Sequence, residues 1–206
     1  MTTFMNRNIR QTQYVEQLIA VLEQIHPLSA VVKDYFRSHC ILRECKKGER
    51  VVHQTQLCEY YYFISSGVLR GFIEEDGKEI TTWISVEGEM ATSIYSLHQK
   101  KPALENIEAV EPTWLLQMKV DELDNLYQKH PSFNTNGRLL LQQYYRDAEL
   151  RAYLARIPEG ERKYQFFRQQ YPHLDNRVPL KYIASFLGIR HETLSRIRSR
   201  LNEGEL

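Results

Sequence analysis

The stretch that decides the fold is residues 178–201, which read VPLKYIASFLGIRHETLSRIRSRL. It predicts a helix that starts near Pro179, because a proline in the first turn loses no helical hydrogen bond. One apolar stripe at helical spacing supports this helix: Ile183, Ala184 and Leu187. Gly188 is expected to end the helix, since glycine takes the left-handed conformation without strain. A second helix follows with the same kind of spacing at Leu194, Ile197 and Leu201. Two short helices joined by a glycine turn predict a helix-turn-helix.

The second helix of this motif is rich in polar and basic side chains. Its outer faces carry Arg190, His191, Glu192, Thr193, Ser195, Arg196, Arg198 and Arg200. An ordinary helical hairpin with a solvated basic face would carry such charges too. It would need neither a polar cluster just after the turn nor apolar spacing that suits both helices across it. We therefore expect the second helix to enter a DNA major groove.

Composition places this motif in a globular protein. The 206 residues are 42% hydrophobic and 26% charged, which suits one large or two modest domains. No apolar run approaches the roughly 20 residues that span a bilayer, and residues 1–9 lack a signal-peptide core, so we expect a soluble, cytoplasmic protein without a membrane partner. The net charge of +1 is unevenly distributed, because residues 156–206 hold ten Lys and Arg against six Asp and Glu. A basic C-terminal part fits a nucleic-acid-binding module.

Before this motif the chain passes from helices to strands and back to helices. Residues 11–25 and 29–40 predict two amphipathic helices, the second capped by Ser29, with four side chains facing inward: Val31, Val32, Tyr35 and Phe36. Short β-branched and aromatic runs then predict strands at residues 42–45, 50–53, 60–64, 68–73, 80–84 and 114–118. Asp76-Gly77 indicates a tight hairpin. Regularly spaced short strands of this kind favour a sandwich or barrel.

A long helix is expected from about Ser132 to Arg156. Its apolar and small residues keep a spacing of about 3.5–3.6 residues, which favours a helix that packs against two neighbours. A helix buried against its own domain is the alternative. Residues 158–160 (Pro-Glu-Gly) suit a hinge, and residues 161–171 predict one more helix before the motif.

Two groups of residues carry a resemblance to a known family. Residues 190–196, Arg-His-Glu-Thr-Leu-Ser-Arg, resemble the core that opens the recognition helix in the Crp/Fnr family of bacterial transcription regulators, except at His191. The turns at residues 47–49, 62–67, 76–79 and 88–89 resemble those of the cyclic-nucleotide-binding β-roll. The resemblance implies an α+β fold with three parts. These are a double-stranded, jelly-roll-like β-roll sensor domain with N-terminal helices (residues 1–130), a long dimerisation helix (131–157) and a winged helix-turn-helix domain (158–206).

The resemblance also implies that one neighbour of the long helix is a second copy, with a dimerisation surface formed by Phe133, Gly137, Leu140, Leu141, Tyr144 and Ala148. Gly137 would permit close approach of two backbones across the dimer axis.

The sensor pocket departs from the family pattern. Thr92-Ser93 stand where cyclic-nucleotide binders carry a Gly-Glu pair for the ribose, and Ala103-Leu104 align with the Arg-Ser/Thr pair that holds the phosphate. A cyclic phosphate needs a fixed cation and close donors, which two apolar side chains do not supply. We therefore expect a degenerate effector pocket that binds neither cyclic AMP nor cyclic GMP. Its residues would be Trp83, Thr92, Ser93, Tyr95, Ala103 and Leu104.

The sequence shows no pattern typical of a metal site, an iron–sulfur cluster or a catalytic site. Cys40, Cys45 and Cys58 have spacings that match no common metal or cluster site, so we interpret them as buried thiols. The seven histidines show no pair at metal-ligand spacing, and no nucleophile or phosphate-loop motif occurs. We expect no metal, no cofactor and no enzymatic activity.

The resemblance and the motif together predict a homodimeric, sequence-specific transcription regulator that binds a pseudo-palindromic site on double-stranded DNA. Arg196 is expected to contact guanine, Glu192 to accept from cytosine N4, and His191 to change the base read at its step. Phosphate contacts are assigned to Lys181, Arg190, Thr193, Ser195 and Arg198.

Two alternatives stay open at this point. The protein could be a constitutive DNA binder whose roll is only a scaffold, or a ligand-sensing roll whose helix-turn-helix contacts another protein. RNA polymerase and an unidentified small-molecule effector are further candidate partners.

Overall fold

The structure, a computed structural model, describes residues 2–172 and 174–203. It begins with α1 (Thr2–Ile25) and α2 (Ala30–His39). Ser29 caps α2 as predicted, because its hydroxyl accepts the Val32 N–H at 3.4 Å. Val32 and Phe36 are buried, but Val31 is 57% exposed, so its inward placement was wrong. Helix α1 also begins nine residues earlier than predicted, and its side chains reach the backbone beside the first strand, with Gln11 donating to the Cys40 carbonyl.

Two four-stranded sheets follow and form the β-roll. The first has the order β1-β8-β3-β6 and the second β2-β7-β4-β5, and every paired neighbour is antiparallel. The strands are β1 (Ile41–Cys45), β2 (Arg50–Val52), β3 (Tyr60–Ser66), β4 (Leu69–Glu75), β5 (Lys78–Ser85), β6 (Met90–Ala91), β7 (Asn106–Ala109) and β8 (Thr113–Lys119). Asp76 and Gly77 both have positive φ, 49° and 73°, so the predicted tight turn joins β4 to β5.

Strands β6 and β7 and the short helix α3 (Ile94–Gln99) were not predicted from the sequence. Strand β7 reads Asn-Ile-Glu-Ala, and all four of its residues are buried. A strand covered on both faces shows no alternation of polar and apolar residues, so the period that reveals half-buried strands is absent.

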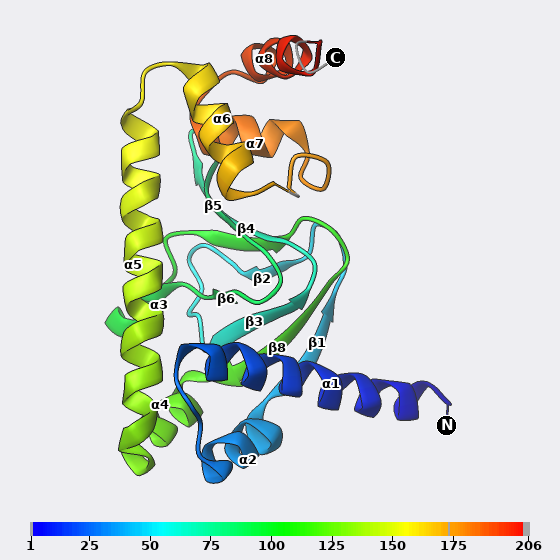
Figure 1. The fold of residues 1–206 in the computed structure, drawn as a ribbon, viewed down its shortest axis with the longest axis vertical. Coiled ribbons are helices and arrows are strands. Elements are labelled where there is room, and N and C mark those ends of the chain that lie inside the picture. The colour runs from blue at the N-terminus through cyan, green and yellow to red at the C-terminus, as the bar shows by residue number, and fades with distance from the viewer. Residues whose placement is uncertain (1, 173, 204–206) are drawn as a thin grey trace.

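After β8 the described part of the chain is helical. Its elements are α4 (Val120–Lys129), the 3-10 turn η1 (Pro131–Phe133), α5 (Asn134–Arg156), α6 (Gly160–Gln170), α7 (Leu180–Leu187) and α8 (His191–Glu203). Figure 1 shows α5 running along one side of the whole molecule, from the N-terminal helices to the C-terminal ones. Helices α6, α7 and α8 gather at one end, beside β4 and β5. The α+β fold with a β-roll, a long helix and a helix-turn-helix is thus confirmed. Within residues 120–172 and 174–203 no strand forms, so the expected wing is not found there.

Three hydrophobic clusters hold these parts together. One lies between the two sheets, one joins α1 and α2 to β8, α4 and η1, and one forms the interior of the helix-turn-helix. The third cluster also contains Val68, Ile84 and Val110, which belong to the roll. The C-terminal helices are therefore packed on their own roll. The domain limits 1–130, 131–157 and 158–206 remain a prediction, and residues 1, 173 and 204–206 within them lie outside the described residues.

Candidate functional site

The helix-turn-helix has the turn that its sequence predicts. Gly188 has φ 63°, and the N–H of Ile189 reaches back to the Ala184 carbonyl at 3.0 Å while the N–H of Gly188 bonds Ser185 O at 3.1 Å. This pair of bonds is a Schellman ending, which satisfies the last carbonyls of α7. The predicted apolar positions are buried except the last: Ile183, Ala184, Leu187, Leu194 and Ile197 are each at most 5% exposed, whereas Leu201 is partly buried. A well-packed interior fixes the angle at which α8 leaves the turn.

The outward face of α8 carries most of the residues predicted to read DNA. Exposed side chains on α7, the turn and α8 are Lys181, Arg190, His191, Glu192, Ser195 and Arg196, while Thr193 is half-buried. Of these, Lys181, Arg190 and Arg196 form no ion pair with a carboxylate in the described part of the chain. Among the described residues, Arg196 donates to the Glu192 carbonyl alone, at 3.3 Å. Three cations on this surface thus have no carboxylate partner in the part of the chain that the structure describes.

Arg198 has a different environment from the one predicted. Its Nη2 donates to Asn176 Oδ1 at 2.8 Å, and its Nε lies 3.7 Å from Asp175 Oδ2. The neighbouring Arg200 pairs with Glu161 at 2.5 Å. Both arginines therefore hold α8 to its own domain. A phosphate contact by Arg198 would require this arginine to leave its partners.

Buried polar groups fix α6 beneath the motif. The Tyr164 hydroxyl donates to Asp175 at 2.6 Å, and burial together with that carboxylate raises the pKa of the phenol. Lys163 is 6% exposed and donates to the Leu187 carbonyl at 2.9 Å and to the Ala155 carbonyl at 3.5 Å. These carbonyls lie in the last turns of α7 and α5, where helix ends carry partial negative charge. One buried ammonium therefore links the end of the long helix to the turn of the motif.

The predicted effector-pocket residues are only partly brought together. Trp83, Thr92 and Tyr95 line one cavity, whereas Ser93, Ala103 and Leu104 are absent from its wall. Thr92 donates to the Tyr60 carbonyl at 2.9 Å. Ala103 is buried, and Leu104 is 57% exposed. The segment aligned with a phosphate site therefore points one side chain into the core and the other into solvent.

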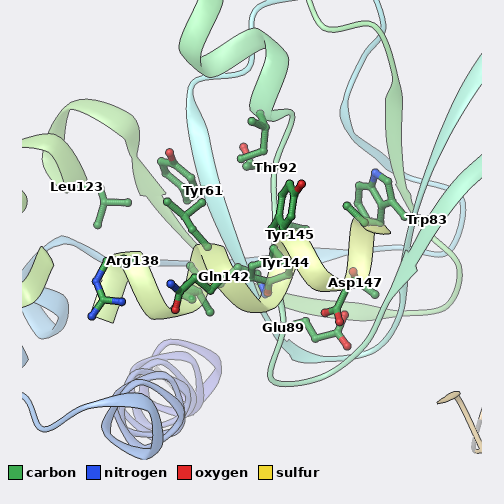
Figure 2. A pocket seen from close by; sticks show the side chains of 18 of the residues that line it. Tyr61, Trp83, Glu89, Thr92, Leu123, Arg138, Gln142, Tyr144, Tyr145 and Asp147 are labelled. Atoms are coloured by element: carbon green, nitrogen blue, oxygen red, sulfur yellow. The ribbon is translucent and has the colours of Figure 1, made fainter. Parts of the chain in front are cut away.

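The cavity lies between the roll and α5 and measures about 1140 Å³. Figure 2 shows aromatic side chains from both sides around it, among them Tyr61, Trp83 and Tyr145. Its carboxylates include Glu89 and Glu105, and burial raises the pKa of each. Glu105 accepts a hydrogen bond from Trp83 Nε1 at 2.9 Å. The wall near Trp83 is thus aromatic and acidic.

Helix α5 carries two heptad stripes rather than one. The inner stripe faces the protein's own domain: Phe133 and Gly137 are buried, and the Tyr144 hydroxyl bonds the Met90 N–H. A Cβ at Gly137 would collide with the Tyr127 hydroxyl oxygen, so this glycine makes room for Tyr127 of the same chain. The outer stripe is exposed in the single chain and consists of Leu141, Tyr145, Ala148 and Ala152, of which the first three also line the cavity.

The predicted dimerisation set mixes these two stripes, which lie one residue apart. Phe133, Gly137, Leu140 and Tyr144 follow the inner heptad, while Leu141 and Ala148 belong to the outer one. Consecutive helical residues are rotated by about 100°, so the two stripes lie on adjacent faces of α5. Exposure separates them clearly, with Leu141 at 61% and Tyr145 at 74%.

The three cysteines are free and buried, which confirms the prediction of buried thiols. Burial raises the pKa of the Cys40 thiol to about 12. In the part of the chain that the structure describes, no cluster of His, Cys, Asp and Glu is arranged to hold a metal ion. No helix among those residues is both long and apolar enough to cross a membrane.

Sequence reasoning missed the polar residues that join the roll to the motif. Arg70 is 1% exposed, and its Nε donates to Glu108 Oε1 at 2.7 Å. Arg177 bonds Glu87 at 2.7 Å and Glu111 at 2.5 Å. Arg70 could have attracted attention as a charge between apolar neighbours in a strand. Nothing in the sequence indicated the partners, because they lie 38 to 90 positions away.

Comparison with known proteins agrees with this geometry. Residues 42–130 match the family described as the cyclic nucleotide-binding domain. No relative is found among curated protein sequences. The structure is similar to FixK2 from Bradyrhizobium japonicum, with a TM-score of 0.70 and 18% identity over 81% of this chain and 86% of that one.

Two further structures show the same likeness. The c-di-GMP-responsive global regulator CLP of Xanthomonas campestris has a TM-score of 0.69 at 16% identity, over 86% of this chain and 94% of that one. A Crp/Fnr-family regulator from Eubacterium rectale has a TM-score of 0.64 at 20% identity, over 86% and 85% of the two chains. Residues 42–130 are thus similar to the cyclic nucleotide-binding domain, and the chain shares the fold of these solved regulator structures.

Proposed function

We propose that this protein is a sequence-specific DNA-binding transcription regulator that acts as a homodimer. The observation that carries the proposal is the outward face of α8. Glu192 and Arg196 are exposed there and Arg190 is exposed in the turn just before α8, while the opposite face of the helix is buried, and neither arginine has a carboxylate partner among the described residues. A packed helix that presents unpaired cations and short polar groups matches the chemistry of base edges and phosphates in the major groove.

Roles within this face follow from position and chemistry. Arg196, one turn into α8, is assigned a bidentate contact to guanine O6 and N7, and Glu192 a contact to cytosine N4. Lys181, Arg190, Thr193 and Ser195 are assigned to phosphates, and His191 to the base step beside them. The tethered Arg198 has a supporting role, in which it holds α8 against the loop that carries Asn176.

The second copy is assigned to the outer stripe of α5. Leu141, Tyr145, Ala148 and Ala152 repeat at intervals of four and three residues, which is the spacing of a coiled-coil seam. Two such helices packed together would present two α8 helices to one face of DNA. Half-sites about 34 Å apart, one helical turn of DNA, would then be read on a pseudo-palindromic site.

Selection from random duplex DNA with the purified protein tests the function. We expect a two-fold motif to be recovered. On that motif, Arg196→Ala should weaken binding by roughly 1–3 kcal/mol and relax specificity at one base pair per half-site, while random DNA is bound as before. Ser199→Ala, also exposed on α8, is the matched control. Recovery of no motif from folded protein, or equal losses on both kinds of DNA, would refute this reading.

We further propose that the roll binds neither cyclic AMP nor cyclic GMP. Side chains fill the space between the sheets, Ala103 and Leu104 offer no phosphate donor, and Glu105 places a carboxyl beside Trp83. Isothermal titration should therefore give no saturable heat with either nucleotide up to about 1 mM. Saturation with one nucleotide per protomer in the micromolar range would contradict the proposal.

A further inference from the structure

Strand β5 lies at the edge of its sheet, and α7 covers that edge. In the order β2-β7-β4-β5, the last strand has a strand neighbour on one side only. An edge of this kind leaves backbone N–H and C=O groups without ladder partners. Here the Ser185 hydroxyl accepts the Thr81 N–H at 2.9 Å and donates to the Glu79 carbonyl at 3.2 Å. A single side chain of the helix-turn-helix thus supplies the hydrogen-bond partner for two backbone groups at the edge of the roll.

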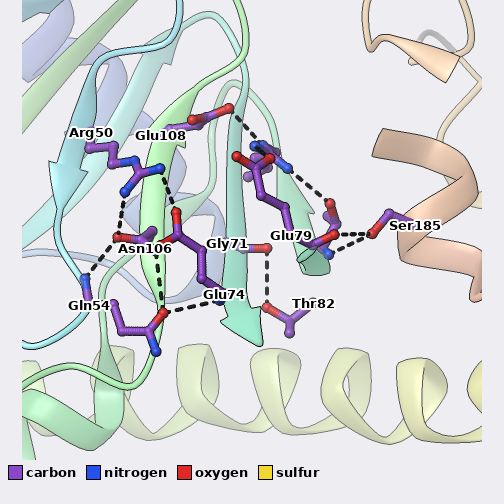
Figure 3. Close-up of polar contacts among 11 residues, drawn as sticks. Arg50, Gln54, Gly71, Glu74, Glu79, Thr82, Asn106, Glu108 and Ser185 are labelled. Carbon is purple, nitrogen blue, oxygen red and sulfur yellow. Dashed lines mark hydrogen bonds and ion pairs between the residues drawn. The ribbon is translucent and has the colours of Figure 1, made fainter. Parts of the chain in front are cut away.

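A buried arginine lies beneath the same contact. Arg70 on β4 donates from Nε to Glu108 at 2.7 Å and from Nη1 to the Thr81 hydroxyl at 3.3 Å, and it forms an ion pair with Glu79. Figure 3 shows Ser185 bonded to Glu79 on one side of this network and Glu108 on the other. Two of the residues that hold Arg70, Glu79 and Thr81, therefore also bond Ser185 of α7.

Tyr182 of α7 covers the arginine. The guanidinium carbon of Arg70 lies 3.6 Å from the centroid of the Tyr182 ring and 4.0 Å from that of Phe72. A cation over a ring is held most strongly when water is excluded, and Arg70 is 1% exposed. If α7 moved off β5, this charge would be uncovered and two edge groups would lose their partner. The hydrogen bonds of Ser185 and the ring contact of Tyr182 therefore fix both where α7 lies on β5 and how it is oriented.

The docked arrangement leaves the proposed DNA face free. Helix α7 turns Tyr182 and Ser185 toward the roll, whereas Lys181 is exposed, as are Arg190 and Arg196. The docked helix-turn-helix and a bound duplex would therefore use different side chains on adjacent surfaces, since Lys181 Nζ lies 4.8 Å from the centroid of the Tyr182 ring. Because the proposed DNA-contacting side chains stay exposed, the contact positions the motif and does not block DNA.

We propose that the outer edge of β5, with Arg70 beneath it, is a platform that docks α7 and fixes the orientation of the helix-turn-helix on the roll. Its consequence for DNA rests on the function proposed above. Holding α8 in one orientation reduces the ordering that binding to two half-sites requires, so docking favours operator binding. Tyr182 and Ser185 act as positioning residues and contact no DNA.

Two variants test the docking. Each removes one contact between α7 and the roll, and hydrogen exchange is then measured at the other contact. In Tyr182→Leu the reporter is hydrogen exchange of the Thr81 amide, which Ser185 still covers. In Ser185→Ala the reporter is exchange of the Arg70 Nε–H, which Tyr182 still shields. Coupled contacts should speed exchange about tenfold at each reporter. Tyr182→Phe keeps the ring and serves as the matched control, and thermal melts show whether each variant is folded.

The DNA consequence is measured with the double variant Tyr182→Leu/Ser185→Ala. We expect about tenfold weaker binding to the selected operator with unchanged binding to random DNA. Reporters that stay as protected as in the native protein overturn the docking platform. Accelerated exchange with equal or tighter operator binding overturns its positioning role. If the native protein binds no operator, the proposed function fails, and the exchange measurements alone then confirm or refute the platform.

Discussion

Replacing Leu141 and Tyr145 together with glutamate is expected to turn the protein into a monomer and to weaken operator binding by about 10²–10⁴-fold. Both side chains are largely exposed in the single chain, at 61% and 74%, and stand four residues apart on the outer stripe of α5. In a dimer they would form a seam between two copies, where unpaired carboxylates carry a large desolvation cost. Operator binding weakens because, in a dimer, binding of one α8 to its half-site keeps the second α8 at a high effective concentration near the other half-site, and a monomer loses this effect.

Light scattering during size-exclusion chromatography reports the mass, and titration of full operator and single half-site reports the affinities. Tyr153→Glu on the same helix is the control, because Tyr153 is 60% exposed but lies one position outside the stripe. It should leave the dimer intact. Half-site binding by the double variant should also be unchanged, since α8 is far along the chain from both substitutions. A dimer that survives the double substitution would place the interface elsewhere.

Replacing Arg70 with methionine is expected to lower the free energy of unfolding by about 3–5 kcal/mol. The side chain of its partner Glu108 is only 9% exposed, and the variant would leave that carboxylate buried without its cation. The loss is larger than for an exposed pair, because water cannot replace the missing partner. Urea unfolding at fixed protein concentration measures it, and the concentration matters because a dimer adds its own stability.

Arg50 offers a matched control within the same sheet. It pairs with Glu74 at 2.7 Å, but these side chains are 32% and 45% exposed. Arg50→Met should therefore cost no more than about 1 kcal/mol. The double variant Arg70→Met/Glu108→Leu should regain much of the lost stability, because it buries no unpaired charge. Similar losses in the free energy of unfolding for Arg70→Met and Arg50→Met would show that the buried pair contributes no more to stability than the exposed one.

The helix-turn-helix could be predicted closely from its residues alone. Its signals are local: apolar spacing within each helix, and a glycine where the chain takes φ 63°. The β4–β5 hairpin was equally accessible, because Asp76-Gly77 specifies its own turn. Strand β7 was missed because its burial on both faces depends on neighbours distant in sequence. Gly137 shows the same limit, since only the folded chain reveals that Tyr127 fills the space beside it.

The residues along the chain thus specify most of its helices and strands, the order in which they follow one another, and the polar side chains of α8. Periodicity and turn chemistry act within a few residues, so a single sequence displays them. The folded arrangement alone assigns partners. It ties Arg198 to Asn176, turns Phe133 inward while Leu141 stays exposed, and brings Ser185 to an edge strand more than a hundred residues earlier in the chain. These contacts depend on which surfaces meet when the clusters pack, and packing is a property of the whole chain rather than of any segment.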